Sequence, residues 1–250
     1  MTVPPNARLI WSGPGSGAMI DLSSHRSGTF FPHWFEFLCL AAQARDRAQQ
    51  TSGSANGQPT SEALTAILFS ALAAEALINE LGEAAARSAN LHPDVRGLDT
   101  LADLATMLDT TERAQGQIDL KYHLASKILA GKTFARGEAP FQDFANLITL
   151  RNELVHPRHR DRTTAEGHVE PASKVIRDLQ QRGLTRTKGI GPGDAPGGMS
   201  WLDGIKSSGV ANWAYDSARD IVSALLMMLP DDDGLPTTLL FRDRISQIPE

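Results

Sequence analysis

Three residues near the middle of the chain, Arg151, Asn152 and His156, have side chains whose types and spacing could do chemistry. They lie in the run Arg-Asn-Glu-Leu-Val-His, directly before Pro157. A histidine titrates near neutrality and can move a proton, and an arginine can hold a phosphate through two hydrogen bonds and stabilise the charge that develops in transfer. This set is suited to RNA cleavage through the 2′-hydroxyl, which needs no metal.

The geometry of the expected helix decides whether these three side chains can meet. Apolar periodicity predicts a helix from Pro140 or Phe141 to about His156. Asn152 and His156 are four residues apart and share a face, whereas Arg151 and His156 would point about 140° apart in an ideal helix. Because a residue before proline is pushed out of the α region, His156 is expected at the helix exit, where its ring can turn toward Arg151 or toward a second subunit.

Basic residues follow this helix at Arg158, Arg160 and Arg162. They predict a local strip that binds the backbone of a polyanion such as RNA. The alternative is a solvated loop, which is the more common structure for a charge run of this kind.

A second polar anomaly falls on a long helix predicted from Thr60 or Ser61 to about Ala89, which is apolar nearly all round. Glu75 projects into the middle of its apolar stripe, and Asn79 follows one turn later. A buried, unpaired carboxylate is unfavourable by several kcal/mol, so the sequence predicts a cation or several donors opposite Glu75. The alternative is a helix-packing hydrogen bond without activity.

The composition favours a single α-helical domain of 250 residues with 41% hydrophobic content and a net charge of −5. The only cysteine, Cys39, lies in an apolar run and is expected to be a buried thiol in a reducing compartment. No run of consecutive apolar residues is long enough to span a membrane, and the first residues lack the pattern of a signal peptide, so a cytoplasmic location without membrane contact is expected. The histidines lack partners at zinc-ligand spacing, and we expect neither a metal nor a cofactor.

The apolar periodicity and the Gly/Pro-rich segments of the chain predict an all-α helical bundle. They also predict an irregular N-terminal arm and a Gly/Pro-rich loop before the last long helix. We expect an extended arm over 1–32, the bundle over 33–230 with a loop-rich insertion at 158–200, and a loosely attached tail over 231–250. The expected helices cover about 34–50, 60–89, 99–108, 118–130, 140–156, 171–181 and 201–229.

The Arg-Asn-x-x-x-His segment at a helix end resembles the signature of the HEPN superfamily of helical-bundle proteins, and the chain looks like an uncharacterised bacterial branch of it. Arg151, Asn152 and His156 match the Arg, the polar residue after it and the His of that motif. The earlier segment 73–80, which contains Glu75 and Asn79, and the residues Lys121-Tyr122 and Asn212-Trp213-Ala214 are also similar to such members.

The resemblance implies a homodimer in which two motifs face one another and form a composite site. It implies a metal-independent endoribonuclease, in a toxin–antitoxin, phage-defence or RNA-processing role, that leaves a cyclic phosphate. In that interpretation Arg151, Asn152 and His156 are catalytic, Glu75 and Asn79 support them, and an antitoxin or regulatory protein is a possible partner. The alternative is a non-catalytic helical module that binds a nucleotide or a protein, since fold alone does not settle function.

Overall fold

The structure is a computed structural model, and it describes residues 32–52, 60–88, 97–156, 162–163, 169–170, 173–186, 200–230, 241 and 244–249. The chain divides into two units between Phe31 and Pro32. The expected N-terminal arm lies outside the described residues, as do Arg158 and Arg160.

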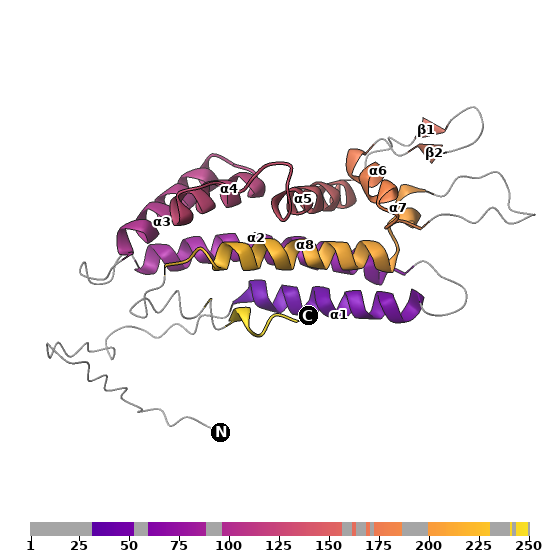
Figure 1. The fold of residues 1–250 in the computed structure, drawn as a ribbon, viewed down its shortest axis with the longest axis horizontal. Helices are drawn as coiled ribbons and strands as arrows, with labels where there is room; N and C mark the ends of the chain where they lie inside the picture. The colour runs from indigo at the N-terminus through magenta and orange to yellow at the C-terminus, as the bar shows by residue number, and fades with distance from the viewer. Residues whose placement is uncertain are drawn as a thin grey trace, which may run out of the picture. The chain divides into compact units, whose positions relative to one another are not determined.

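The all-α helical bundle predicted from the sequence is confirmed (Figure 1). Two strands of two residues each, which the sequence pattern did not indicate, pair antiparallel inside the 158–200 insertion. In chain order, the described elements are α1 (His33–Ser52), α2 (Glu62–Ser88), α3 (Leu98–Arg113), α4 (Ile118–Ala130), α5 (Phe141–Val155), β1 (Arg162–Thr163), β2 (Val169–Glu170), α6 (Lys174–Gln181), α7 (Trp201–Gly204) and α8 (Ser208–Leu226).

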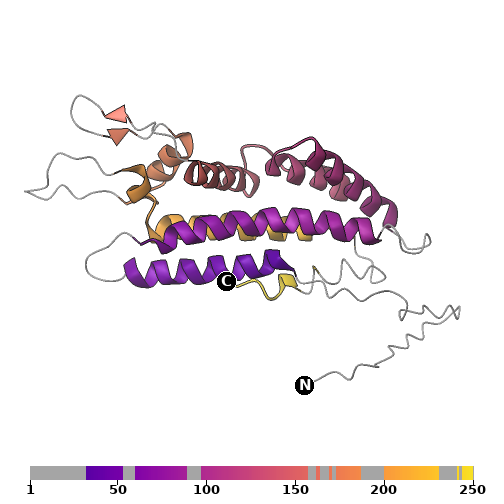
Figure 2. The ribbon, with the colours of Figure 1, turned by 180° about the vertical axis from the view of Figure 1, so that it is seen from behind.

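The long helices α1, α2 and α8 form the base of the bundle, and their relative directions follow from two hydrogen bonds at one end. Gln49 near the end of α1 donates from Nε2 to Oδ1 of Asn212 near the start of α8, at 2.8 Å. The amide of Thr60, just before α2, donates to the carbonyl of Lys206, just before α8. Hence α2 and α8 run parallel and α1 runs antiparallel to both. Two opposite views show α1 on one side of the α2–α8 layer and α3, α4 and α5 on the other (Figures 1 and 2).

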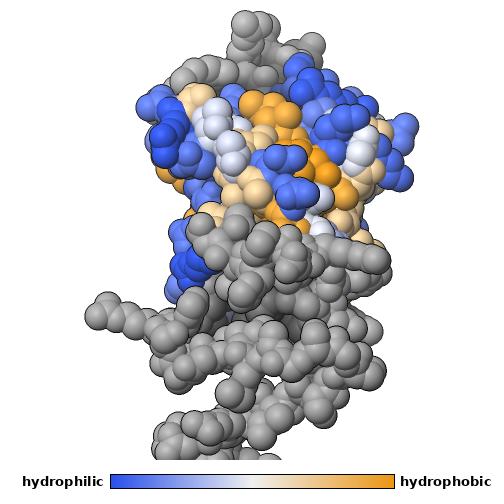
Figure 3. Space-filling view, turned by 90° about the vertical axis from the view of Figure 1, so that its left-hand side faces the viewer, coloured by the Kyte–Doolittle hydropathy of each residue, from blue (hydrophilic) through white to orange (hydrophobic). Residues whose placement is uncertain are grey.

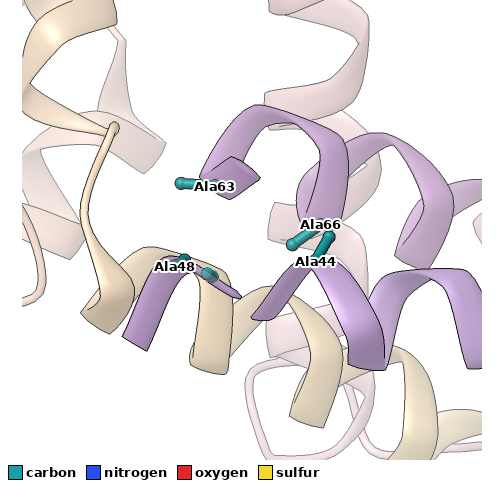
Figure 4. Packing of buried hydrophobic residues seen from close by; sticks show 5 residues of the cluster. Ala44, Ala48, Ala63 and Ala66 are labelled. Atoms are coloured by element: carbon teal, nitrogen blue, oxygen red, sulfur yellow. The ribbon is translucent and has the colours of Figure 1, made fainter. Parts of the chain in front are cut away.

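Small side chains allow α1, α2 and α8 to approach closely. Ala44 and Ala48 of α1 meet Ala63 and Ala66 of α2 in a cluster that also includes Ala211 of α8, and all five are buried (Figure 4). An alanine loses no side-chain entropy on burial and is the strongest helix former, so the same residues favour both the helices and their contact.

Aromatic rings hold α4 and α5 together and fix them to α2. Tyr122 of α4 packs on Phe144 of α5 with ring centroids 4.6 Å apart, and Phe144 also meets Phe141. The Tyr122 hydroxyl donates to the carbonyl of Ala74 on α2 at 2.8 Å, and burial raises the pKa of this phenol. Tyr122 thus contacts both α2 and α5 and fixes the position of α5 relative to α2. This in turn positions the C-terminal residues of α5.

α2 is, among the described helices, the one that is long and apolar enough to cross a membrane by length and composition alone. Half of its most apolar window is buried inside the bundle, and one such helix does not by itself establish a membrane span. A helix that is covered by α1, α3, α5 and α8 needs apolar residues on nearly every face, which explains its composition.

The tail was expected to be loosely attached, and this expectation is wrong for its described residues. Phe241 is fully buried and stacks on Trp34 at the start of α1. Pro249 accepts a hydrogen bond from the hydroxyl of Tyr215 on α8. Contacts this distant in sequence leave no local periodicity that could have revealed them.

The continuous helix expected over 201–229 is also wrong, because the chain leaves the helix between α7 and α8. Ser207 adopts an extended conformation, and its side chain accepts a hydrogen bond from the Val210 amide, which begins α8 as a new helix. The Ser207 hydroxyl also donates to the carbonyl of Leu184, and Gly209 lies against the same backbone.

The substitution Gly209→Ala is expected to lower the free energy of unfolding by about 1–3 kcal/mol, as overpacking does. The added Cβ would lie 2.8 Å from the carbonyl oxygen of Leu184, which is backbone and cannot rotate away. Urea unfolding measures the change. The matched control is Gly204→Ala, whose Cβ meets nothing within 4 Å. Equal unfolding free energies for the two variants would contradict the close approach.

Glu80 of α2 holds the start of α1. Its Oε1 accepts from the backbone amide of His33 at 3.0 Å, which satisfies one of the free amides at the helix N-terminus, and it also meets the His33 ring at 3.2 Å. Burial raises the pKa of the Glu80 carboxyl, although the hydrogen bonds from His33 lower it in part.

The wild-type protein is therefore expected to lose stability relative to Glu80→Gln as the pH rises above 4.5, the ordinary pKa of a glutamate. A raised pKa in the folded state means that the native protein holds its proton longer than the unfolded chain, so ionisation favours unfolding. The stabilisation is complete below 4.5 and is lost as the pH passes through the folded pKa. Urea titrations of both proteins from pH 4 to 7 measure the difference, and parallel curves would contradict it.

Candidate functional site

α5 ends within one residue of the end that the sequence predicted, two positions before Pro157. Val155 is its last residue, and His156 has φ −122° and ψ 65°, outside the α region. Its backbone amide still donates to the carbonyl of Asn152 at 2.9 Å. The His156 side chain is exposed, and its ring has no hydrogen-bond partner among the described residues. A histidine placed in this way is free to meet a ligand.

Arg151 is the cation that the sequence predicted opposite Glu75. Its Nη2 lies 2.9 Å from Oε2 of Glu75, which joins α5 to α2 across 76 residues of chain. The Glu75 side chain is 33% exposed and that of Arg151 is 24% exposed. Glu75 thus lies at the edge of the contact between the two helices, rather than in the middle of a buried stripe as expected.

The orientation of the Arg151 guanidinium is set by a second bond. Nη1 donates to Oδ1 of the neighbouring Asn152 at 3.0 Å. Arginine has five N–H donors in a rigid fork, and with one donor on each carboxylate or amide oxygen three remain. Since the Asn152 oxygen faces Arg151, its amide nitrogen is left as a donor at an exposed position. Arg151 and Asn152 together can present donors to an anion.

Asn79 was expected to support the same group, but it is bonded elsewhere. Its Oδ1 accepts from Nζ of Lys121 on α4 at 2.9 Å, and Lys121 also pairs with Glu112 at the end of α3. Lys121 is only 5% exposed. In the sequence, Lys121 stands out only through the family resemblance, and its bond to Asn79 was not predicted. The sequence feature that could have revealed this bond is the position of Lys121 beside Tyr122, on a helix that packs against α2.

The predicted basic strip is only partly within the described residues. Arg158 and Arg160 lie outside them, and Arg162 forms β1 with Thr163, paired to β2. Whether these arginines approach His156 therefore stays a prediction.

Two clefts in the described surface lie away from these side chains. The larger, of about 580 Å³, is lined by residues of the α3–α4 turn, the α4–α5 connection and α5, among them Gln115, Arg136 and Gln142. The smaller, of about 290 Å³, has Asp143 at its edge, which accepts from the indole of Trp213 at 3.1 Å and from Arg182. Neither cleft is lined by Arg151, Asn152 or His156, and Asn152 and His156 are exposed in the described part of the chain.

Apolar side chains also reach the surface of the described part of the molecule. They are visible between hydrophilic ones at the end where α3 lies (Figure 3). The large apolar residues that are most exposed include Val155, at 49%, which directly precedes His156. Val155 could contact a ligand or a partner, and the neighbouring His156 could transfer a proton.

No protein-family model, curated protein or solved structure matches this chain.

The ion pair between Glu75 and Arg151 is expected to contribute a coupling energy of about 1 kcal/mol in a double-mutant cycle with alanine at both positions. Partial burial limits competition from water, so the pair is stronger than an exposed one. The matched control is the pair Glu83 and Arg87 on the exposed face of α2, with side chains 66% and 64% exposed. Its coupling should be about 0.3 kcal/mol. Equal coupling in both cycles would rule out a special role for the Glu75 contact in holding Arg151.

Proposed function

We propose that this protein is a HEPN-like, metal-independent endoribonuclease in which Arg151, Asn152 and His156 act on RNA. The observation that carries the proposal is the placement of Arg151: Glu75 and Asn152 hold its guanidinium at the C-terminal turn of α5, where His156 is exposed. An anchored cation and an exposed histidine at the end of one helix suit phosphate chemistry. The resemblance described above supports the same assignment, and a toxin or phage-defence role is consistent with it.

In the proposed reaction His156 accepts the proton of a ribose 2′-hydroxyl. The 2′-oxygen attacks the adjacent phosphorus, the bond from phosphorus to the 5′-oxygen breaks, and the leaving oxygen takes up a proton. The products are a 2′,3′-cyclic phosphate and a 5′-hydroxyl end. Arg151 offsets the negative charge that develops on the phosphate oxygens, while Asn152 donates its amide nitrogen to one of them.

One histidine cannot be base and acid at once for the same phosphate. In the homodimer that the resemblance implies, a second His156 supplies the acid, and the two surfaces together enclose side chains that are exposed in one copy. Arg158, Arg160 and Arg162 would hold the RNA on either side of the cleaved bond.

A binding module is the second candidate, and one observation favours it. Two of the Arg151 donors are already used inside the protein, by Glu75 and Asn152, as expected for a residue that only satisfies the helix contact. The exposed His156 has no such structural role among the described residues and favours the enzyme.

Purified protein in excess chelator is expected to cleave a mixed-sequence RNA, and His156→Ala and Arg151→Ala should each lower the rate by at least about 100-fold. Loss of the base or of the transition-state cation removes a separate part of the mechanism. The matched control is Arg113→Ala, an arginine 79% exposed on α3, which should keep the wild-type rate. Gel analysis of the cleaved ends checks for the cyclic phosphate.

Circular dichroism and light scattering must show that the variants keep their fold and oligomeric state. Cleavage that persists in both variants would place the activity elsewhere. The absence of cleavage by the wild type over a broad panel of RNAs, together with binding of a nucleotide or a protein, would replace the enzyme by the binding module.

A further inference from the structure

The larger cleft of the described surface has a volume of about 580 Å³ and is lined by the turn from α3 to α4, the connection from α4 to α5, and α5 itself. Small-molecule sites in proteins have volumes of about 300–1,000 Å³, so this cleft is large enough for a ligand. Its lining combines an arginine, apolar side chains and side-chain amides. This combination indicates the chemistry of the ligand.

Two of the lining side chains have no counterpart inside the protein. Arg136 is exposed and forms no ion pair with a residue of the described ranges. Leu120 is 38% exposed, one of the few large apolar side chains that reach the described surface to this extent, and the ring of Phe141 lines the same cleft. An unpaired guanidinium and an uncovered apolar side chain fit a ligand that has a phosphate at one end and a flat apolar face.

Groups that can bond the edge of a flat ligand line the cleft as well. The side-chain amides of Gln115 and Gln117 have no hydrogen-bond partner in the described part of the chain. Oδ1 of Asp119 accepts from the Leu120 amide at 2.9 Å, which leaves Oδ2 as an acceptor. An amide offers both a donor and an acceptor, and a carboxylate accepts from the N–H groups of a nucleobase. Because Asp119 repels a phosphate, the phosphate belongs at Arg136 and the base edge at the amides and Asp119.

The cleft and His156 lie on the same exposed face of α5. Gln142, which lines the cleft, is followed by Thr149 and His156 at steps of seven residues, and all three are exposed. Seven residues are close to two full turns, so these positions form one stripe along the helix. The stripe is about 20 Å long, from the rise per residue of an α-helix. A ligand that occupies the cleft and also reaches His156 must therefore be an extended chain.

We propose that this cleft, which we call the base cleft and define by Leu120, Arg136 and Gln142, binds one unpaired nucleobase of single-stranded RNA, a few nucleotides from the bond that His156 acts on. The assignment rests on the proposed function, because RNA is the ligand at both places. Bases of single-stranded RNA can leave the stack, pack on protein side chains and be read at their edges. Occupation of the base cleft would determine which bond of the RNA lies at His156.

The test measures the affinity of a fluorescent, mixed-sequence single-stranded RNA by anisotropy. It uses full-length His156→Ala protein, so that the RNA is not consumed. Arg136→Ala and Leu120→Ala, each added to this background, are expected to weaken binding at least about fivefold. The two variants should differ in salt dependence. Arg136→Ala should reduce the slope of log K against log[salt] by about 0.7, the value for one phosphate contact on a single strand, whereas Leu120→Ala should leave the slope unchanged.

The matched controls are Leu40→Ala and Arg47→Ala on α1. Leu40 is 36% exposed, almost as much as Leu120, and Arg47 is an exposed arginine. Both belong to the helix on the other side of the α2–α8 layer from α4 and α5 (Figures 1 and 2). They should keep the affinity and the salt slope of the His156→Ala protein.

The outcomes separate the base cleft from the ribonuclease activity. Cleavage by the wild type, together with unchanged RNA affinity in Arg136→Ala and Leu120→Ala, would overturn the base cleft and leave the enzyme. Losses confined to the two cleft variants, without cleavage by the wild type, would support the base cleft and remove the enzyme. Losses as large in the α1 controls, or no RNA binding by the His156→Ala protein, would also overturn the base cleft.

Discussion

The burial of α2 is the constraint on which the rest of this structure depends. α1, α3, α5 and α8 cover it, so it must be apolar on nearly every face, and a charged or amide side chain that faces a neighbouring helix favours a partner on that helix. Glu75 finds Arg151 on α5, and Asn79 finds Lys121 on α4. Each of these two positions of α2 is thus matched by a cation from a helix above it, and Arg151 lies at the edge of the contact between α2 and α5, opposite Glu75.

The sequence predicted those features that depend on local chemistry. Pro157 ends α5, Gly131 adopts the left-handed conformation after α4, and Glu75 has the cation that its position demanded. The features that it missed depend on contacts between distant segments. The break before α8 is stabilised by the bond from Ser207 to Leu184, and the tail is held by Trp34, which lies more than two hundred residues earlier. The bond from Lys121 to Asn79 was not foreseen, because periodicity identifies a polar residue on a buried face but not which neighbouring helix reaches it.

Arg151 contributes both to stability and to the proposed function, so a substitution of Arg151 changes both at once. Removal of Arg151 takes away a candidate phosphate ligand, but it also leaves Glu75 without its partner at the helix contact. Removal of His156 changes an exposed ring that supports no described contact. A functional defect in a His156 variant therefore speaks directly about chemistry, whereas a defect in an Arg151 variant must be compared with the effect of changing Glu75 alone.

An open surface is a poor place for electrostatic catalysis, because water weakens the attraction between a guanidinium and a phosphate. In one copy of the chain Asn152 and His156 are exposed, and neither of the two clefts contains them. The proposed reaction would need a second surface that excludes water, such as the RNA or a second copy of the chain. Val155, exposed beside His156, would be covered by either. The proposed reaction needs both the exclusion of water and a second proton donor. RNA alone brings no such donor, whereas a second copy of the chain brings another His156. One contact with a second copy would therefore meet both needs.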